Sequence, residues 1–192
     1  ATVFQFSLYA LSPSQIRYTH LSVEQGLSQV SITSILQDQY GFMWFGTQNG
    51  ISIFSEGEFI NIDRSNGLSN ERVRCIQKDN FGNMWIGTYF GGIMKYNYRD
   101  FISYNSSNKL PSNQILSIAE NKKNELIIGT IDGASTLLYN HNTFQSDPKI
   151  FTNSNLLGQA VHTIFKDSNQ VLFYGTQNGL LIDVGNKFVS IT

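Results

Sequence analysis

The sequence predicts an all-β fold, a β-propeller built from four-stranded blades, and three observations support this prediction. A short phrase occurs twice, as DQYGFMWFGTQNG at 38–50 and DNFGNMWIGTYFGG at 79–92, with weaker copies at 121–133 and 167–179. The Gly-Thr pairs of the four copies lie 41, 42 and 46 residues apart, and a period of about 40–45 residues is typical of propeller blades. The composition, 41% hydrophobic, 13% aromatic and 14% charged, indicates a globular domain and not a disordered chain.

The second repeat shows how one blade is built. The residues from Val73 to Lys78 alternate and are rich in β-forming types, so we expect the innermost strand there. Residues 79–82 predict a turn, because Asp accepts from backbone N–H groups two residues on and Gly can take a positive φ. The other three strands are expected at 84–88, 93–96 and 101–104.

The same plan applied to every repeat predicts blades at roughly 30–63, 73–104, 115–152 and 161–191. Each inner strand has a small residue at its centre, which fits crowding near the axis. Each second strand has a large apolar residue two places before a glycine. We expect the large residue to fill the space between neighbouring blades and the glycine to let the neighbour approach closely. The positions are Ser34, Cys75, Ser117 and Thr163; Trp44, Trp85, Ile127 and Phe173; and Gly46, Gly87, Gly129 and Gly175.

The N-terminal region predicts one strand more than four blades need. Residues 16–21, IRYTHL, stand before the first blade where an outermost strand would stand. We therefore expect residues 16–192 to be the front part of a larger propeller, of about seven blades. An unpaired strand and exposed blade faces favour self-association into a homo-oligomer. Residues 1–15 are interpreted as a signal-peptide remnant or an N-terminal extension, because 3–11 are apolar and small residues follow.

The repeated pattern resembles a known family. D-x-x-G-x-x-W-x-G-T-x-x-G, the preceding Q-G-L-S (25–28) and N-G-L-S (66–69), and the opening IRYTHLSVEQGLSQ are similar to the two-component regulator propeller repeat. The resemblance implies the periplasmic sensor region of a hybrid two-component histidine kinase that responds to oligosaccharides. It also implies signalling through a dimer, and a membrane attachment and kinase that lie outside this chain.

Charge and residue types exclude several other functions. A net charge of −1 gives no electrostatic field for nucleic acid. The three histidines have no metal-ligand spacing and the single cysteine, Cys75, is interpreted as a packing residue, so no metal or cofactor is expected. Asp38 and Asp79 recur once per blade in a turn, whereas a catalytic pair must flank one bond. We therefore expect structural turns there and no enzyme activity in this segment.

Candidate ligand-binding residues come from the loops that enter the inner strands and from the turns between the second and third strands. In a propeller these loops share one face, where aromatic rings can stack on sugars and Arg, Asn and Gln can form directional hydrogen bonds. The candidates are Gln29, Asn70, Arg72, Arg74, Tyr89, Phe90, Gln114 and His162, with Tyr89 and Phe90 foremost. Two other functions stay open: a propeller scaffold for protein interactions without a small-molecule ligand, and a glycan-active enzyme.

Overall fold

The structure is a computed structural model that describes residues 18–108, 110–122, 125–139, 149–150, 156–185 and 188–191. It contains four antiparallel four-stranded sheets, in each of which consecutive strands pair in the order of the sequence. The strands are β1 (Ile32–Gln37), β2 (Met43–Thr47), β3 (Gly50–Ser55) and β4 (Glu58–Ile62); β5 (Val73–Lys78), β6 (Met84–Thr88), β7 (Ile93–Tyr96) and β8 (Phe101–Tyr104); β9 (Ile115–Lys122), β10 (Glu125–Thr130), β11 (Gly133–Leu138) and β12 (Lys149–Ile150); and β13 (Val161–Lys166), β14 (Leu172–Thr176), β15 (Gly179–Asp183) and β16 (Phe188–Ile191).

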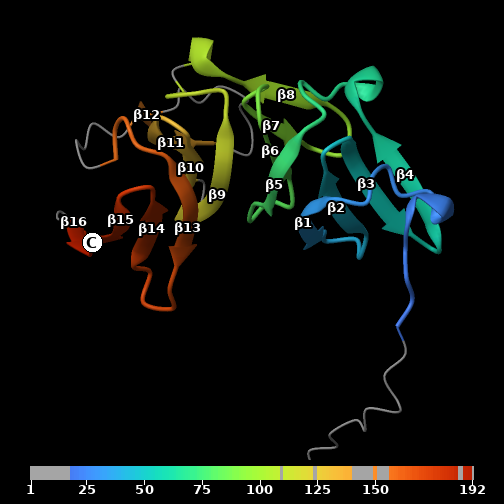
Figure 1. Ribbon diagram of the computed structural model, residues 1–192, viewed down its shortest axis with the longest axis horizontal. Coiled ribbons are helices and arrows are strands. Elements are labelled where there is room, and N and C mark those ends of the chain that lie inside the picture. Colours follow the sequence, from blue (N-terminus) through green and yellow to red (C-terminus); the bar gives the residue numbers. More distant parts are fainter. Residues whose placement is uncertain are drawn as a thin grey trace, which may run out of the picture.

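The four sheets follow one another as the blades of a partial propeller (Figure 1). The first strands of successive blades, β1, β5, β9 and β13, are in contact with one another in that order. Short 3-10 turns at Val23–Gln25, Arg64–Asn66 and Ser106–Asn108 precede the first three blades. The all-β propeller prediction is therefore confirmed, and the four strands predicted in the second repeat coincide with β5 to β8.

The extra strand predicted at the N-terminus is not formed in the part of that segment that the structure describes. The structure assigns no strand to residues 18–21, while residues 1–17, including the possible signal-peptide remnant, lie outside the described residues. A β-strand needs a neighbouring strand to hydrogen-bond with. The fourth blade already has its own outermost strand, β16, so it offers residues 18–21 no place in its sheet.

Large side chains fill the space between neighbouring blades, as predicted. Trp44 is 1% exposed and belongs to one apolar cluster with Val73 and Met94 of the second blade. Trp85 is completely buried and packs with Ile115 of the third blade. These contacts are the hydrophobic core of the molecule, which lies between sheets and not within one.

The glycine in each second strand makes room for the following blade. A Cβ at Gly46 would lie 2.8 Å from Val73 Cγ1, and one at Gly87 would lie 2.6 Å from Ile115 Cγ2. A Cβ at Gly129 would meet the Ser117 hydroxyl of its own blade and a backbone atom of the next blade, the carbonyl oxygen of Val161, at 2.7 Å. Real Cβ contacts are longer than these, so the predicted close approach is confirmed for the first three blades.

Hydroxyl groups tie the inner strands of neighbouring blades together. Thr33 Oγ1 donates to the carbonyl oxygen of Val73 at 2.8 Å, and Ser34 Oγ accepts from the N–H of Ile76 at 3.0 Å. Ser117 Oγ donates to the carbonyl oxygen of Val161 at 3.2 Å. The small residues near the axis therefore satisfy backbone groups of the next blade as well as saving space.

The two repeated aspartates stabilise turns and also hold the tryptophans. Asp79 Oδ1 accepts from the N–H groups of Phe81 and Asn83, both at 2.9 Å, and its Oδ2 accepts from Trp85 Nε1 at 2.9 Å. Asp38 has the same arrangement, with Trp44 Nε1 at 2.9 Å. The turn interpretation is confirmed, and each carboxylate also fixes the position of an interblade side chain.

Candidate functional site

One face of the molecule is formed by the loops that enter the inner strands together with the turns between second and third strands. The N–H of Tyr89, first residue of the β6–β7 turn, donates to the carbonyl oxygen of Arg72, just before β5, at 2.9 Å. The equivalent hydrogen bond in the third blade joins Ile131 to Gln114 at 3.2 Å, and in the fourth blade it joins Gln177 to Ala160 at 3.1 Å. These bonds hold the two kinds of loop side by side, as predicted.

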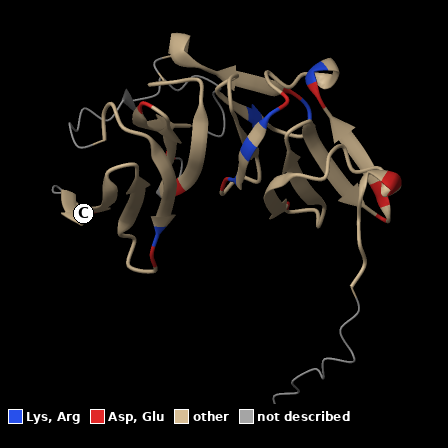
Figure 2. Cartoon of the chain, viewed as in Figure 1, with Lys and Arg blue, Asp and Glu red and all other residues tan. Residues whose placement is uncertain are grey.

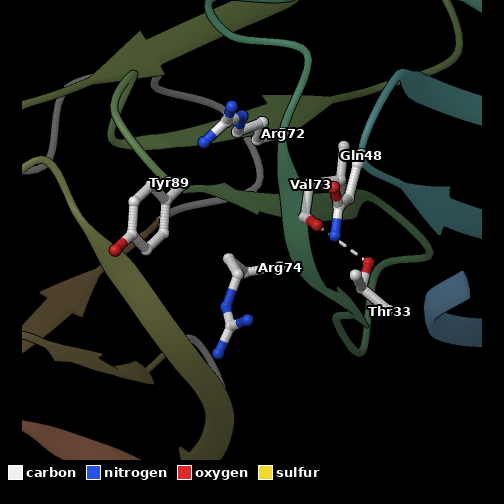
Figure 3. A pocket seen from close by; sticks show the side chains of 6 residues that line it. All are labelled: Thr33, Gln48, Arg72, Val73, Arg74 and Tyr89. Carbon is white, nitrogen blue, oxygen red and sulfur yellow. Dashed lines mark hydrogen bonds between the residues drawn. The ribbon is translucent and has the colours of Figure 1, made fainter. Parts of the chain in front are cut away.

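A pocket of about 260 Å³ opens on this face between the first and second blades (Figure 3). Its lining consists of Thr33, Gln48, Arg72, Val73, Arg74 and Tyr89. Figure 3 shows the Tyr89 ring on one side, Gln48 and Thr33 on the other, and the two arginines between them. Ligand pockets that enclose drug-sized molecules are about 300–1,000 Å³, so this volume suits one small unit of a larger ligand.

The apolar floor of the pocket is rigid. Val73 is fully buried, and its carbonyl oxygen accepts from the hydroxyl of Thr33 across the blade boundary. The Tyr89 ring is half-buried and meets the ring of Phe90 edge-on, with centroids 4.5 Å apart. The side chains of Gln48, Arg72 and Arg74 are exposed at the rim, where their donors can reach a bound molecule.

The two arginines give the pocket a positive charge. Arg72 lies just before β5 and Arg74 lies within it, and both are exposed while Val73 between them is buried. Among the described residues neither arginine forms an ion pair, and the ion pair of Arg99 with Asp100, at 3.8 Å, lies outside the pocket lining. Figure 2 shows that most of the strand surface carries no charged residues.

The structure brings together three of the eight predicted site residues. Arg72, Arg74 and Tyr89 line the pocket, and the neighbour of Tyr89, Phe90, is 50% exposed beside it. Asn70 lies just before them, and its Oδ1 accepts from the N–H of Arg72 at 3.1 Å.

The other three predicted residues lie elsewhere. Gln29 accepts from the N–H of Ser31 in the loop before the first blade, and Gln114 belongs to the third blade. His162 is an exposed residue of β13 in the fourth blade. Whether any of the eight binds a ligand stays a prediction, but only the second-blade group shares one pocket.

The sequence analysis missed Gln48 and Thr33. Gln48 stands directly after the Gly-Thr pair of the first repeat, the position that Tyr89 occupies in the second. The repeat alignment alone could therefore have identified it. Thr33 is the counterpart of Arg74 in the inner strand of the first blade.

Catalytic and metal chemistry find no support in the described residues. In that part of the chain, no three His, Cys, Asp or Glu side chains are grouped so as to hold a metal ion. Asp38 and Asp79 are both buried in their turns. Burial raises the pKa of the Cys75 thiol to about 12, which suits a packing residue and opposes a nucleophile.

Comparison with known proteins agrees with the repeat pattern. The model of the two-component regulator propeller family matches residues 26–49 and 67–90. These segments supply the loops and turns around the pocket, while the two later repeats fall outside the match. No curated protein matches the sequence.

Solved structures share the fold at low sequence identity. The extracellular domain of BT4673 from B. thetaiotaomicron, described as part of a one component system in one structure and of a hybrid two component system in another, superposes with a TM-score of 0.72 at 22% identity. That match covers 91% of this chain and 28% of the other. The extracellular domain of the hybrid two component system BT3049 from the same organism gives a TM-score of 0.52 at 24% identity, covering 89% and 31%.

Enzymes of propeller fold also match. A catalytically inactive virginiamycin B lyase from Staphylococcus aureus has a TM-score of 0.65 at 14% identity, over 87% of this chain and 57% of that one. Identities this low demonstrate a common fold alone. The chain spans less than a third of the two extracellular domains it resembles. In the described residues, no helix is both long enough and apolar enough for a membrane span.

Proposed function

We propose that this chain is part of the periplasmic sensor region of a hybrid two-component histidine kinase and that its propeller face binds an oligosaccharide. The observation that carries the proposal is the pocket between the first two blades. It is built by the same two repeats that match the two-component regulator propeller family. Its mixture of one aromatic ring and several hydrogen-bond donors is the chemistry that recognises sugars.

Each lining residue has a role in this proposal. The apolar face of a pyranose ring packs against Tyr89, which its contact with Phe90 holds in place. Gln48, Arg72 and Arg74 donate hydrogen bonds to hydroxyl groups at the rim. Val73 closes the floor and excludes water from beneath the ring.

Signalling follows from where the ligand sits. A sugar that touches both Gln48 of the first blade and Tyr89 of the second favours one angle between these blades. A ligand shifts an equilibrium by its difference in affinity for the two arrangements. In the receptor we expect that difference to move a dimer between two states across the membrane, through parts of the protein beyond this chain.

Titration of the 192-residue chain with oligosaccharides tests the proposal. Saturable binding of a glycan, measured by calorimetry, is expected, and Tyr89→Ala should weaken it about tenfold by removing the stacking surface. Ile131→Ala is the matched control, because Ile131 occupies the same turn position in the third blade. If a broad panel of oligosaccharides fails to bind the folded protein, or if both variants weaken binding equally, the proposal is wrong.

A further inference from the structure

The two arginines of the pocket have a more specific consequence. Arg72 and Arg74 both line a pocket of about 260 Å³, and neither forms an ion pair with another described residue. Guanidinium groups cannot lose their protons in a protein. The lining of the pocket therefore carries two positive charges, and both attract a negative group that binds there.

This charge belongs to the second blade alone. The residues equivalent to Arg72 are Gln114 in the third blade and Ala160 in the fourth, as their shared hydrogen bond shows. The counterparts of Arg74 are Thr33, Leu116 and His162. The propeller architecture needs no cation at either position, so the pair is a feature of this pocket and not of the repeat.

The arrangement of the lining favours an anionic group that is attached to a ring. A guanidinium binds a carboxylate or sulfate through two parallel hydrogen bonds, which fixes the orientation of the anion as well as its position. Tyr89 lies beside the arginines with its ring available for an apolar face, and the Gln48 amide faces it across the pocket (Figure 3).

We infer that the pocket selects an acidic sugar, a saccharide unit that carries a carboxylate or a sulfate, with Arg72 and Arg74 binding the acidic group and Tyr89 the sugar ring. This inference rests on the proposed function and narrows its ligand class. Gln48 then donates to a ring hydroxyl and Val73 lies beneath the sugar.

Paired oligosaccharides test the inference on the full chain. Oligogalacturonate is compared with neutral galacto-oligosaccharide, and a sulfated chondroitin oligosaccharide with its unsulfated form. At least one acidic or sulfated member should bind at least tenfold more tightly than its partner, and its affinity should fall as salt rises. Inorganic sulfate alone is measured as well, because it carries the charge without the sugar ring.

Substitutions of the two arginines test whether they cause the preference for the acidic sugar. Arg72→Gln and Arg74→Gln should each weaken binding of the acidic member about tenfold or more and weaken binding of the neutral member clearly less, because a hydrogen bond to a charged group contributes more than one to a hydroxyl group. Arg99→Gln is the matched control, because it removes the same charge from an exposed site outside the pocket lining. Tryptophan fluorescence in urea confirms that each variant is folded.

The other outcomes separate this inference from the proposed function. Equal binding of charged and neutral partners, unaffected by the arginine variants, overturns the acidic-sugar inference and leaves oligosaccharide sensing intact. Sulfate that binds as tightly as the acidic oligosaccharide shows an anion site without sugar selectivity, which also overturns it. If no member of either pair binds, and the broad panel fails too, both proposals are wrong.

Discussion

Replacing Asp79 by Asn should destabilise the protein, because the acceptor oxygen Oδ2 becomes a donor NH₂ group. Asp79 is 4% exposed, and its Oδ2 accepts from Trp85 Nε1 and from Asn83 Nδ2, both at 2.9 Å, while Oδ1 accepts two backbone N–H groups of the turn. An Asn side chain can keep the Oδ1 bonds, but its NH₂ group then faces the indole N–H. Two donors face each other, and Trp85 has no access to water because it is fully buried.

The size of the effect follows from these contacts. A hydrogen bond to a charged group contributes about 1.5–3 kcal/mol, and a buried donor without an acceptor costs about 1–3 kcal/mol. The carboxylate also lies near the buried ammonium of Lys95, whose pKa is lowered by burial and raised by Asp79. We therefore expect Asp79→Asn to lower the free energy of unfolding by about 2–4 kcal/mol.

The fourth blade supplies a matched control. Asp167 accepts from the backbone N–H of Val171 at 2.8 Å. The large residue of that blade is Phe173, whose side chain has no N–H group to donate to the aspartate. Asp167→Asn should therefore cost less than about 1 kcal/mol. Urea unfolding, followed by circular dichroism and by the fluorescence of the chain's two tryptophans, measures both variants.

A double variant isolates the pair. Trp85→Phe removes the donor, so Asp79→Asn should cost clearly less in that background than in the native chain. Equal costs for Asp79→Asn and Asp167→Asn, or no coupling in the double variant, would refute the idea that the aspartate stabilises the blade through the indole.

Three further predictions concern packing, reactivity and the link between blades. Gly129→Ala should lower the free energy of unfolding by about 1–3 kcal/mol, because its Cβ would press on a backbone carbonyl of the next blade. Gly158→Ala is the control: no atom lies within 4 Å of its Cβ, so it should cost only the strain of a positive φ. The raised pKa of Cys75, about 12 against 9.0 for a free thiol, should leave about a thousandfold less thiolate in the folded than in the unfolded protein below pH 9. Labelling of Cys75 by a disulfide reagent should therefore be far slower in the folded protein than in urea, and equal labelling rates would contradict this. The same shift makes stability fall as pH rises from 9 towards 12, because the unfolded thiol loses its proton first; Cys75→Ala should reduce that fall. Tyr98→Phe should cost about 1 kcal/mol by removing a 3.0 Å hydrogen bond to the buried aspartate of the first blade, whereas Tyr40→Phe, at an exposed ring, should change the urea midpoint little.

Most of the fold could be predicted from the sequence because its signals are local. Alternation marked the strands, and the Asp and Gly of each turn have conformational preferences that act within a few residues. The period then placed every blade without knowledge of its neighbours. The role of Gly46 and Gly87 was also predictable, since a residue without a side chain at a fixed place in each repeat implies a close contact.

The failed and missing predictions concern contacts between distant residues. The strand expected at residues 16–21 needed a partner that the local pattern could not identify, and residues 18–21 form none. The hydrogen bond from Tyr98 to Asp38 joins residues 60 apart and depends on the angle between two blades. The pocket depends on the same angle, so the repeat alignment pairs Gln48 with Tyr89 but does not show that both line one pocket.

The way in which the blades fit together bears on how such a protein can grow. Each of the first three repeats has a glycine in its second strand against which the next blade packs. Each also has, at the start of its own inner strand, an aliphatic residue of the type that packs against such a glycine. A tandem duplication of one repeat's coding sequence therefore yields a segment that matches both of its new neighbours at once. Copy number can change by recombination without a new interface having to evolve. Surface loops such as the one at Tyr89 are then free to diverge in one copy while the others preserve the architecture.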